Sequence, residues 1–562
     1  MGLIAVKKAN CKNCYRCLKN CSVKSIRYKD EKVDIIDNQC ILCGRCIITC
    51  EQKAKSLTND VEAIKALAIG EERTVVSLAP SFITAYGTEN AGRVAAALRS
   101  LGFDYIEETS IGARYVTDEY ANLIELGEMS NILSSCCPTV NMLVQKYYPD
   151  LVSLIAPVLS PMQAHGKLIK ENYGMDTRVV FIGPCVSKLD EAKNGGYIDG
   201  AITFRQLDDL LNEKNISILK MPSETFDRHS GYSRIYPIEN GILYDLKNRD
   251  HVGDRYDFIS VSGIDNIKQM LADIRSGRLN HSFIEVNACT GGCVGGPMMP
   301  EKSTPLYRSK NKVMDYAGDT LEEPEYSPID ISYYYKQAGL ITDIPGEETI
   351  RKILTQIGKP TKEQELNCGS CGYPTCRDKA IAVYQGKAEL YMCMPYMNDI
   401  SQTLSNVVLG ASPNFIVAVD GDMKIKEINA SALKLFRVSR TEALKHFLFE
   451  YIDTTDFLKV FDEKENIYNK KVSYDNFGVV TDQTIIYVKE HGLAVGVLMD
   501  ITEKVEAAEN MYNLRMESVE MAQKVIDKQM TVAQEIASLL GETTAETKVT
   551  LNKLKNLILK DR

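Results

Sequence analysis

The carboxyl-terminal part of the chain shows the clearest alternation of hydrophobic and polar residues. Residues 412–429 contain two apolar runs separated by an Asp-Gly pair that begins at Asp420, which predicts a strand, a tight turn and a second strand. Asn429 then opens a predicted helix. Two more strand-like runs follow, at 478–490 and 491–500. The pattern predicts an α+β domain within residues 400–505.

From Val505 onward the apolar residues recur at alternating steps of three and four, which is typical of an amphipathic helix. The stripe comprises Ala522, Val525, Gln529, Val532, Ile536 and Leu539, widened by Ile526, Ala533 and Leu540. Gly541 ends this pattern before a second amphipathic stretch at 549–559. Because an apolar helix face needs a partner, residues 506–562 are expected to form a dimeric coiled coil or four-helix bundle. The alternative is that both helices pack on their own chain.

The overall composition is that of a globular protein of several domains. At about 150 residues per domain, 562 residues predict three or four domains. Lys plus Arg number 66 against 75 Asp plus Glu, and the net charge of −9 argues against a nucleic-acid partner. The sequence has neither a run of about 18 apolar residues nor a signal-peptide pattern, so we expect a cytoplasmic protein without a membrane partner.

The 17 cysteines decide the class of chemistry. They are clustered, and none lies beyond Cys393. Disulfide frameworks are typical of short secreted chains, whereas clustered cysteines in a long intracellular chain indicate metal ligation. We therefore interpret the clusters as metal-binding sites.

The first eight cysteines repeat the pattern Cys-x2-Cys-x2-Cys-x3-Cys twice within residues 1–60, as in bacterial ferredoxins that bind two 4Fe-4S clusters. In such runs the fourth cysteine ligates the other cluster. The predicted ligand sets are Cys11, Cys14, Cys17 and Cys50 for one cluster, and Cys21, Cys40, Cys43 and Cys46 for its neighbour. Structural zinc is the alternative, although zinc sites usually pair two Cys-x2-Cys knuckles.

A further four-cysteine group lies within residues 360–398. Its members are Cys368, Cys371, Cys376 and Cys393. Glycines among them allow the backbone to fold tightly around an inorganic core, and residues 377–392 are predicted to form one helix that returns the chain to the site. The group resembles the small helical 4Fe-4S domains of redox enzyme subunits, and zinc is the alternative because the spacing suits either metal.

The remaining five cysteines occur in three short segments far apart in the sequence. These segments are Ser134-Ser-Cys136-Cys137-Pro138, Gly183-Pro184-Cys185-Val-Ser-Lys188-Leu-Asp-Glu191, and Glu285-Val-Asn287-Ala-Cys289-Thr-Gly-Gly-Cys293-Val-Gly-Gly296. In this order they resemble the three signature motifs of FeFe hydrogenases, over residues from about 72 to 355. The resemblance implies a two-lobed α/β domain within 70–355, with helices flanking parallel sheets.

The resemblance also implies a cofactor, the H-cluster. Its 4Fe-4S part would be held by Cys137, Cys185, Cys289 and Cys293. Cys293 would also bridge to a diiron subsite that carries CO, cyanide and an azadithiolate. Lys188 would donate to one cyanide, and the turn Ala79-Pro80-Ser81 would lie at the other. Cys136 would be a free thiol that passes protons to and from the bridging amine, the alternative being a small buried hydrophobic residue.

Several positions differ from the family pattern. The two relay glutamates are replaced by Tyr120 and Leu123, and the relay serine by Ala156, none of which can carry a proton as a carboxylate does. Protons must then leave Cys136 by another route, through Glu119 or water, or turnover is slow. Four positions of the cofactor pocket also differ, namely Val140, Met162, Gly183 and Asn287, and they remove polarisable side chains from the neighbourhood of the irons.

Residues 400–505 look like a PAS domain, through the initial strand pair and the closing turn that begins at Asp500. The segment has no cysteine for flavin photochemistry. His446 and His491 are expected to be surface or packing residues, not haem ligands.

The complete prediction is a multidomain α/β and α+β protein. A ferredoxin-like domain for two 4Fe-4S clusters precedes the H-cluster domain, the small 4Fe-4S domain, the PAS domain and a C-terminal amphipathic helix. FeFe hydrogenases of this architecture are grouped as sensory. The predicted function is slow reversible H2 oxidation and proton reduction by a homodimer, whose state is relayed to a separate kinase or phosphatase. The alternatives are a metabolic hydrogenase that exchanges electrons with ferredoxin, and an Fe-S signalling adaptor without the diiron subsite.

Overall fold

The computed structural model describes residues 2–59, 61–249, 255–318, 328–340 and 343–540, and residue 553. Internal contacts divide the chain into two units, residues 1–396 and residues 397–562. No helix in the described part of the chain has the length and apolar content needed to cross a membrane.

The amino-terminal residues fold as a structural repeat that follows the repeat in the sequence. Strands β1 (Ile4–Val6) and β4 (Lys55–Leu57) pair antiparallel, as do β2 (Ile26–Lys29) and β3 (Lys32–Ile35). Helices α1 (Arg16–Lys19) and α2 (Arg45–Ile48) each contain the third cysteine of one run. Both helices are entered through a left-handed residue, Tyr15 at φ 57° and Gly44 at φ 71°, so the chain turns in the same way around each group of cysteines.

The first lobe of the following region is built on a four-stranded parallel sheet. Its strand order is β6-β5-β8-β9, with β5 at Thr74–Leu78, β6 at Tyr105–Glu108, β8 at Arg178–Gly183 and β9 at Gly200–Thr203. All five residues of β5 are buried, as expected for a central strand covered on both faces. The helices of this lobe are α3 (Val61–Ala68), α4 (Phe82–Tyr86), α5 (Ala91–Ser100), α8 (Pro161–Tyr173), α9 (Val186–Gly195) and α10 (Phe204–Glu213).

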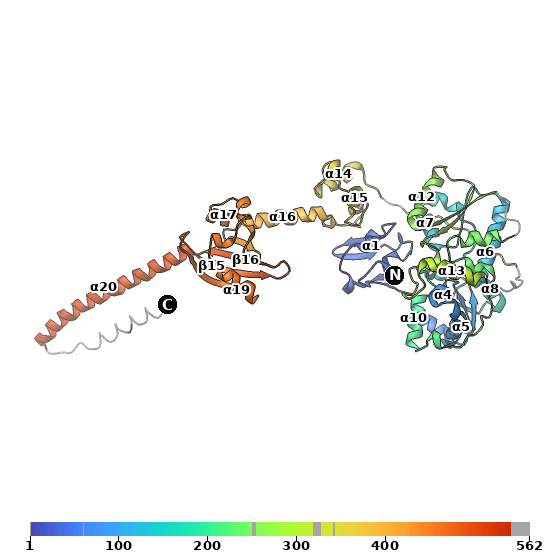
Figure 1. Ribbon diagram of the computed structural model, residues 1–562, viewed down its shortest axis with the longest axis horizontal. Helices are drawn as coiled ribbons and strands as arrows, with labels where there is room; N and C mark the ends of the chain where they lie inside the picture. Colours follow the sequence, from blue (N-terminus) through green and yellow to red (C-terminus); the bar gives the residue numbers. More distant parts are fainter. Residues whose placement is uncertain are drawn as a thin grey trace. The chain divides into compact units, whose positions relative to one another are not determined.

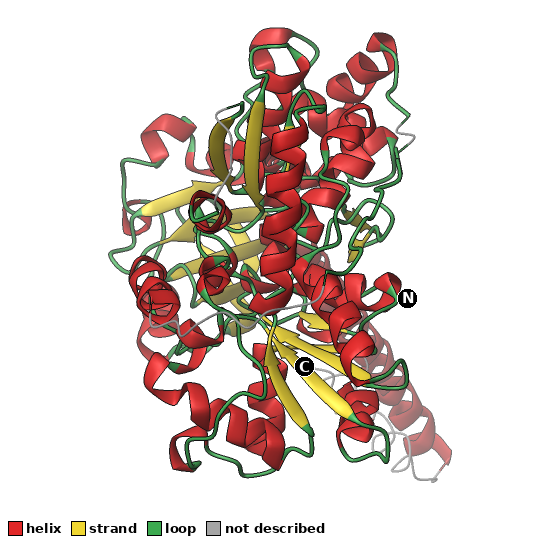
Figure 2. Cartoon of the chain, turned by 90° about the vertical axis from the view of Figure 1, so that its right-hand side faces the viewer, coloured by secondary structure: helices red, strands yellow, loops and turns green. Residues whose placement is uncertain are grey.

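The second lobe contains a three-stranded parallel sheet. The order is β10-β11-β7, with β7 at Ile132–Leu133, β10 at Asp257–Ser262 and β11 at Ser282–Asn287. Helices α6 (Ser110–Leu126), α7 (Pro138–Tyr147), α11 (Gly241–Lys247), α12 (Ile264–Arg275) and α13 (Leu306–Gly318) complete this region. Helices α7 and α12 lie at one end of the region and α5 and α10 at the other (Figure 1), and helices surround the strands (Figure 2). The expected pair of α/β lobes with parallel sheets is therefore present.

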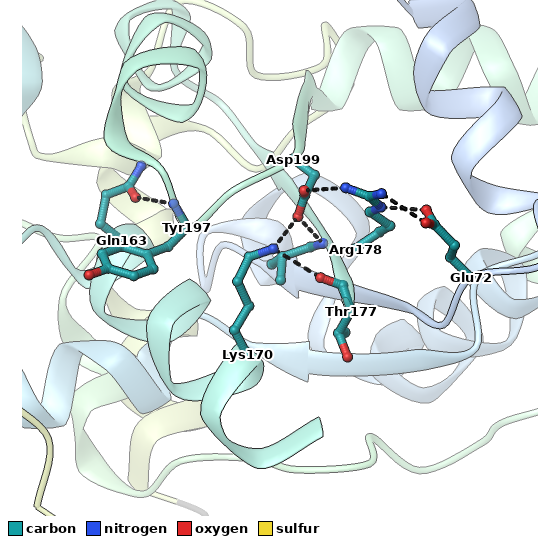
Figure 3. Close-up of polar contacts among 8 residues, drawn as sticks. Glu72, Gln163, Lys170, Thr177, Arg178, Tyr197 and Asp199 are labelled. Atoms are coloured by element: carbon teal, nitrogen blue, oxygen red, sulfur yellow. Dashed lines mark hydrogen bonds and ion pairs between the residues drawn. The ribbon is translucent and has the colours of Figure 1, made fainter. Parts of the chain in front are cut away.

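Polar contacts fix the start of strand β8 in the first lobe (Figure 3). The Arg178 guanidinium bridges Glu72 and Asp199, with 2.8 Å to Glu72 Oε1 and 3.2 Å to Asp199 Oδ1. Lys170 Nζ donates to Asp199 Oδ2 at 2.8 Å and to the Thr177 carbonyl at 3.0 Å. These bonds join the end of α8 to the amino-terminal ends of β8 and β9, so the opposite ends of the strands are left for the site.

Residues 347–393 form a compact helical segment. It comprises α14 (Glu347–Gln356), η7 (Lys362–Gln364), α15 (Cys376–Tyr384) and η8 (Leu390–Met392), and α16 (Met394–Ala411) follows it. The prediction of one helix over 377–392 is wrong, because α15 ends at Tyr384. Gly386 adopts a left-handed φ of 66°, which stops the helix and turns the chain before η8.

The second unit contains a five-stranded antiparallel sheet in the order β13-β12-β16-β15-β14. Its strands are β12 (Phe415–Val419), β13 (Ile425–Ile428), β14 (Ile467–Tyr474), β15 (Val479–Val488) and β16 (Leu493–Asp500), and its helices are α17 (Ala430–Phe436), α18 (Arg440–Ala443) and α19 (Thr455–Glu463). The four predicted strands and the Asn429 helix cap are confirmed, since the Asn429 side chain accepts the N–H of Ala432. Strand β14 was not predicted, because four consecutive residues of it are exposed and polar or aromatic.

Helix α20 spans Thr502–Leu540 and confirms the long carboxyl-terminal helix. Val525, Val532 and Ile536 of the predicted stripe are about half exposed, at 54%, 49% and 51%. The predicted break at Gly541 and the second amphipathic stretch at 549–559 lie outside the described residues, apart from residue 553.

A buried carboxylate in the second lobe should make stability depend on pH. Burial raises the pKa of Glu285 to about 7, although its carboxylate accepts the N–H groups of Leu243, Asn240 and Ile242. The folded chain therefore holds a proton that the unfolded chain releases, and the free energy of unfolding should fall as the pH rises from about 4.5 to 7, by up to about 3 kcal/mol. Urea denaturation of the iron-free chain across this range should show this fall reduced in Glu285→Gln. The exposed Glu301→Gln is the control, and an identical pH dependence in Glu285→Gln would contradict the assignment.

Candidate active site

The three cysteine motifs lie at the carboxyl ends of parallel strands. Cys137 follows β7, Cys185 follows β8, and Cys289 follows β11. Cys293 begins the short 3-10 helix η6 (Cys293–Gly295). In α/β proteins ligands bind at the carboxyl edges of the sheets, and here the two lobes present these edges to one cavity.

The cavity has a volume of about 100 Å³ and is lined by all four cysteines that the sequence assigns to the central cluster. Cys136, Lys188 and the predicted pocket residues Ala79, Pro80, Ser81, Met162 and Asn287 also line it. Most of the remaining wall is apolar. The structure therefore brings together residues separated by more than 200 positions in the chain.

The four cysteines need a positively charged group between them. Burial raises the pKa of Cys137, Cys289 and Cys293, and proximity to the other cysteines raises these pKa values further. Ionised thiols enclosed together in an apolar cavity would be strongly destabilised unless a cation compensated their charge. Thiolate ligands suit the irons of an iron-sulfur cluster, so this donor set fits such a group.

Lys188 and Ser81 are among the polar residues that line the cavity beside the cysteines. The Lys188 Nζ atom lies 2.8 Å from Ser160 Oγ and 2.7 Å from Glu191 Oε2. Burial by itself disfavours the ammonium, but Glu191 outweighs it and the pKa of Lys188 is raised, so the side chain stays cationic. Ser81 Oγ is fully buried and makes no hydrogen bond within the described part of the chain. An unsatisfied hydroxyl and an ammonium at one apolar cavity would suit a ligand with hydrogen-bond acceptors.

The thiol of Cys136 has a direct hydrogen-bond partner in Tyr120. The Tyr120 hydroxyl lies 3.2 Å from Cys136 Sγ and 2.9 Å from Ser135 Oγ, and it accepts the Ser135 N–H at 2.8 Å. Burial raises the pKa of Cys136 to about 12 and that of Tyr120 well above its usual value, so both groups remain protonated at neutral pH. Glu119, which was predicted as part of another proton route, accepts a hydrogen bond from the Asn122 side chain at the surface. Tyr120, at the position of an expected relay glutamate, is thus a direct polar neighbour of Cys136.

Gly183 does not line the cavity, and Phe181 takes its place. A Cβ atom added at Gly183 would lie 2.7 Å from Cζ of Phe181 and 3.1 Å from Cβ of Ala79. The phenyl ring therefore fills the space that a longer side chain at position 183 would need. Asn287 is held by a hydrogen bond from its Nδ2 to Glu285 Oε1 at 2.9 Å. Val140 is buried in α7 and is not among the residues that line the cavity.

The sequence reasoning missed several residues of the cavity wall. They are Thr109, Ser110, Phe181, Tyr236, Pro237 and Ile242. Thr109 and Ser110 directly follow β6, as Ala79 follows β5, so their position after a parallel strand could have identified them. Phe181 is two residues before Gly183, and side chains two apart on a strand share a face.

One of the two amino-terminal ligand sets lies next to this cavity. Cys21, Cys40, Cys43 and Cys46 line one small cavity of about 20 Å³, as predicted for one cluster. Cys43 and its neighbour Leu42 also line the active-site cavity. In the other predicted set, the pKa of Cys17 is raised, and burial is the main cause. Lys55 and the Leu18 backbone lower this pKa, whereas Cys11 and Cys50 raise it. Cys14 of the same set is exposed. An electron could therefore pass from the active-site cavity to the neighbouring set over a short distance.

The third group also converges. Cys368, Cys371, Cys376 and Cys393 line a separate cavity of about 20 Å³. Lys359 and Lys379 line the same cavity, and burial lowers the pKa of Lys379 to about 8. Among the described residues, no three His, Cys, Asp or Glu side chains are placed to hold a single metal ion.

Two family models match parts of the chain. Residues 72–297 match the family model of the iron only hydrogenase large subunit, C-terminal domain, and residues 364–395 match a family model for an Fe-S cluster. The NADP-reducing hydrogenase subunit HndD of Solidesulfovibrio fructosivorans is 28% identical over 378 residues, which are 55% of this chain and 64% of that protein. The chain thus spans just under two thirds of this relative's length.

Another relative is named as an assembly factor and not as a hydrogenase. The cytosolic Fe-S cluster assembly factor NAR1 of Yarrowia lipolytica is 23% identical over 359 residues, covering 46% of this chain and 73% of that protein. A solved structure of the FeFe hydrogenase HydA1 of Chlamydomonas reinhardtii aligns with 50% of this chain and 99% of its own at 18% identity, with a TM-score of 0.40. The family-model match shows that residues 72–297 are similar to the C-terminal domain of the iron only hydrogenase large subunit.

Proposed function

We propose that this protein is a sensory FeFe hydrogenase that oxidises H2 and reduces protons slowly and reversibly. One observation carries the proposal. The active-site cavity holds more than the four cysteines that a 4Fe-4S cluster requires, because Cys136, Lys188 and the unsatisfied Ser81 hydroxyl line it too. These three polar groups have a role if the cavity takes a diiron subsite with acceptor ligands beside the cluster.

Each side chain has a distinct task in this proposal. When bound at the four cysteines, the H-cluster would supply the iron chemistry that splits or forms H2. Lys188, held by Ser160 and Glu191, presents its ammonium as a fixed hydrogen-bond donor. Ser81 offers its hydroxyl from the turn after β5. The apolar wall keeps bulk water away from both donors, which strengthens their hydrogen bonds.

Proton movement would begin at Cys136 and Tyr120. Both groups are neutral at pH 7, so neither stores charge, but each can accept one proton while it releases another. The 3.2 Å contact between Tyr120 Oη and Cys136 Sγ and the 2.9 Å contact to Ser135 Oγ provide the first two steps of such a relay. Because neutral hydroxyls are weaker proton carriers than carboxylates, turnover should be slow.

The second unit suggests the sensory role. The first strand of its sheet lies between the second and the last, and the helices fall between the second and third strands, an arrangement that we attribute to a PAS domain. In the proposal this unit and α20 pass the redox state to a separate kinase or phosphatase. A metabolic hydrogenase linked to ferredoxin is the alternative, and rapid H2 evolution with reduced ferredoxin would favour it.

A second candidate function is an Fe-S protein without hydrogen chemistry. The similarity to the Fe-S cluster assembly factor NAR1 favours it. In that case the active-site cavity would hold only a 4Fe-4S cluster, and Lys188 and Cys136 would have no reacting partner.

Isotope exchange between H2 and D2O separates these candidates. The full-length protein, matured with the diiron cofactor, is expected to catalyse exchange, and Cys136→Ala should lower the rate about 100-fold at unchanged iron content. The matured chain failing to exchange at full iron content would support the Fe-S protein instead.

Replacement of the Tyr120 hydroxyl tests the relay. Tyr120→Phe keeps the ring packing but removes the contact to Cys136, so exchange should slow by about tenfold or more. The control is Tyr307→Phe, since Tyr307 is 93% exposed on α13. Equal exchange rates in Tyr120→Phe and the wild type would exclude Tyr120 from the route.

The exposed stripe of α20 predicts a homodimer. Light scattering after size exclusion should give twice the chain mass for the wild type and the monomer mass for a Val525→Lys, Val532→Lys double variant, because the charges would be buried in the helix interface. Gln534→Lys, at an exposed polar position of the same helix, is the control. A monomeric wild type would rule out this role of the helix.

A further inference from the structure

Two lysines are buried at the cavity of the third cysteine group. Lys359 is 5% exposed and Lys379 is 1% exposed, although lysine is rarely buried so completely. Both line the cavity formed by Cys368, Cys371, Cys376 and Cys393. No aspartate or glutamate is among the residues that line this cavity.

The two ammonium groups approach different cysteines. Lys379 Nζ donates to the Glu389 carbonyl, lies 5.9 Å from the centre of the Tyr373 ring, and interacts electrostatically with Cys371, Cys393 and the Glu389 carboxylate. That carboxylate accepts the Asp30 N–H and is not among the residues that line the cavity. Lys359 interacts with Cys368 and donates to the Gln364 carbonyl at 3.5 Å. A carbonyl oxygen does not neutralise an ammonium, so each lysine brings positive charge to the cavity.

Positive charge at this place affects reduction. A 4Fe-4S cluster held by four thiolates is an anion, and each electron that it accepts adds a negative charge. A buried cation nearby stabilises the reduced form more than the oxidised form, because Coulomb interactions are strong in a protein interior. Net charge around a cluster is one of the factors that set its potential.

The site contacts the amino-terminal ligand sets, and the chain continues from it into α16. Tyr373 belongs to one buried cluster with Cys17 and Cys21 of the amino-terminal sets, and Lys24 Nζ donates to the Gly372 carbonyl at 2.9 Å. Met394 and Pro395 also line the cavity and form the first turn of α16, whose later residues belong to the second unit.

We propose that Lys359 and Lys379 hold the reduction potential of this site high enough for electrons from the active-site cavity to collect there, where α16 begins. The inference rests on the proposed hydrogenase function for the source of the electrons. Oxidation of one H2 releases two protons and two electrons, and one electron reduces this site while the other reduces one of the amino-terminal clusters. The lysines act only through the positive charge that they place beside the cysteines, and they take no part in bond breaking.

A redox titration of the full-length protein, followed by electron paramagnetic resonance, tests the proposal. Lys379→Met and Lys359→Met should each lower the midpoint of the same single wave. We expect about a tenfold fall in the equilibrium constant for one-electron reduction, which corresponds to about 59 mV. Lys362→Met removes the same charge from an exposed position of the same segment and should leave every wave unchanged.

Three results would overturn the proposal. They are unchanged waves in both variants, an equal shift in Lys362→Met, and loss of four irons from both variants, which would make the lysines structural. The isotope exchange of the matured protein is measured independently. Exchange with unmoved waves rejects the lysine proposal alone, whereas moved waves without exchange reject the hydrogenase function and leave the lysine effect in place.

Discussion

Four cysteines that line one largely apolar cavity impose the constraint on which the rest of the structure depends. Burial and the neighbouring cysteines raise the pKa of Cys137, Cys289 and Cys293, so these thiols can ionise together only around a cationic core. A rigid frame must hold these side chains together, and the carboxyl edges of two parallel sheets supply it. The two lobes present those edges to one cavity. The polar contacts at the start of β8 and the buried Glu285 hold strands of these lobes in place.

The other cysteine groups follow one another in space, starting at the active-site cavity. Cys43 lines the active-site cavity, and Cys21 of the same set shares a buried cluster with Tyr373 of the third group. In the proposed function, electrons would pass from the active-site cavity through these groups toward the start of α16. In the same proposal, protons would enter and leave through Cys136 and Tyr120.

Much of this arrangement could be predicted from the sequence, because thiolate ligands leave a fixed spacing and parallel strands bring distant motifs to one edge. The spacing could not reveal Phe181 in the place of a side chain at Gly183, since that depends on packing between neighbouring positions. The sequence predicted that Tyr120 replaces a proton-relay glutamate without its function, because a residue type alone does not show its hydrogen-bond partners. The end of α15 at Tyr384 was missed because residues 377–392 contain no proline, and a single glycine in such a run does not show by itself that Gly386 adopts a left-handed turn.

Infrared spectroscopy of the anaerobically matured protein tests the central claim most directly. Bound CO and cyanide absorb in a spectral window free of protein bands, so the spectrum reports the diiron subsite alone. The account predicts such bands, and it predicts that they shift when hydrogen is added. Absence of the bands after maturation with the diiron cofactor would contradict it, and the pocket around Phe181, Met162 and Asn287 would then belong to an Fe-S protein without hydrogen chemistry.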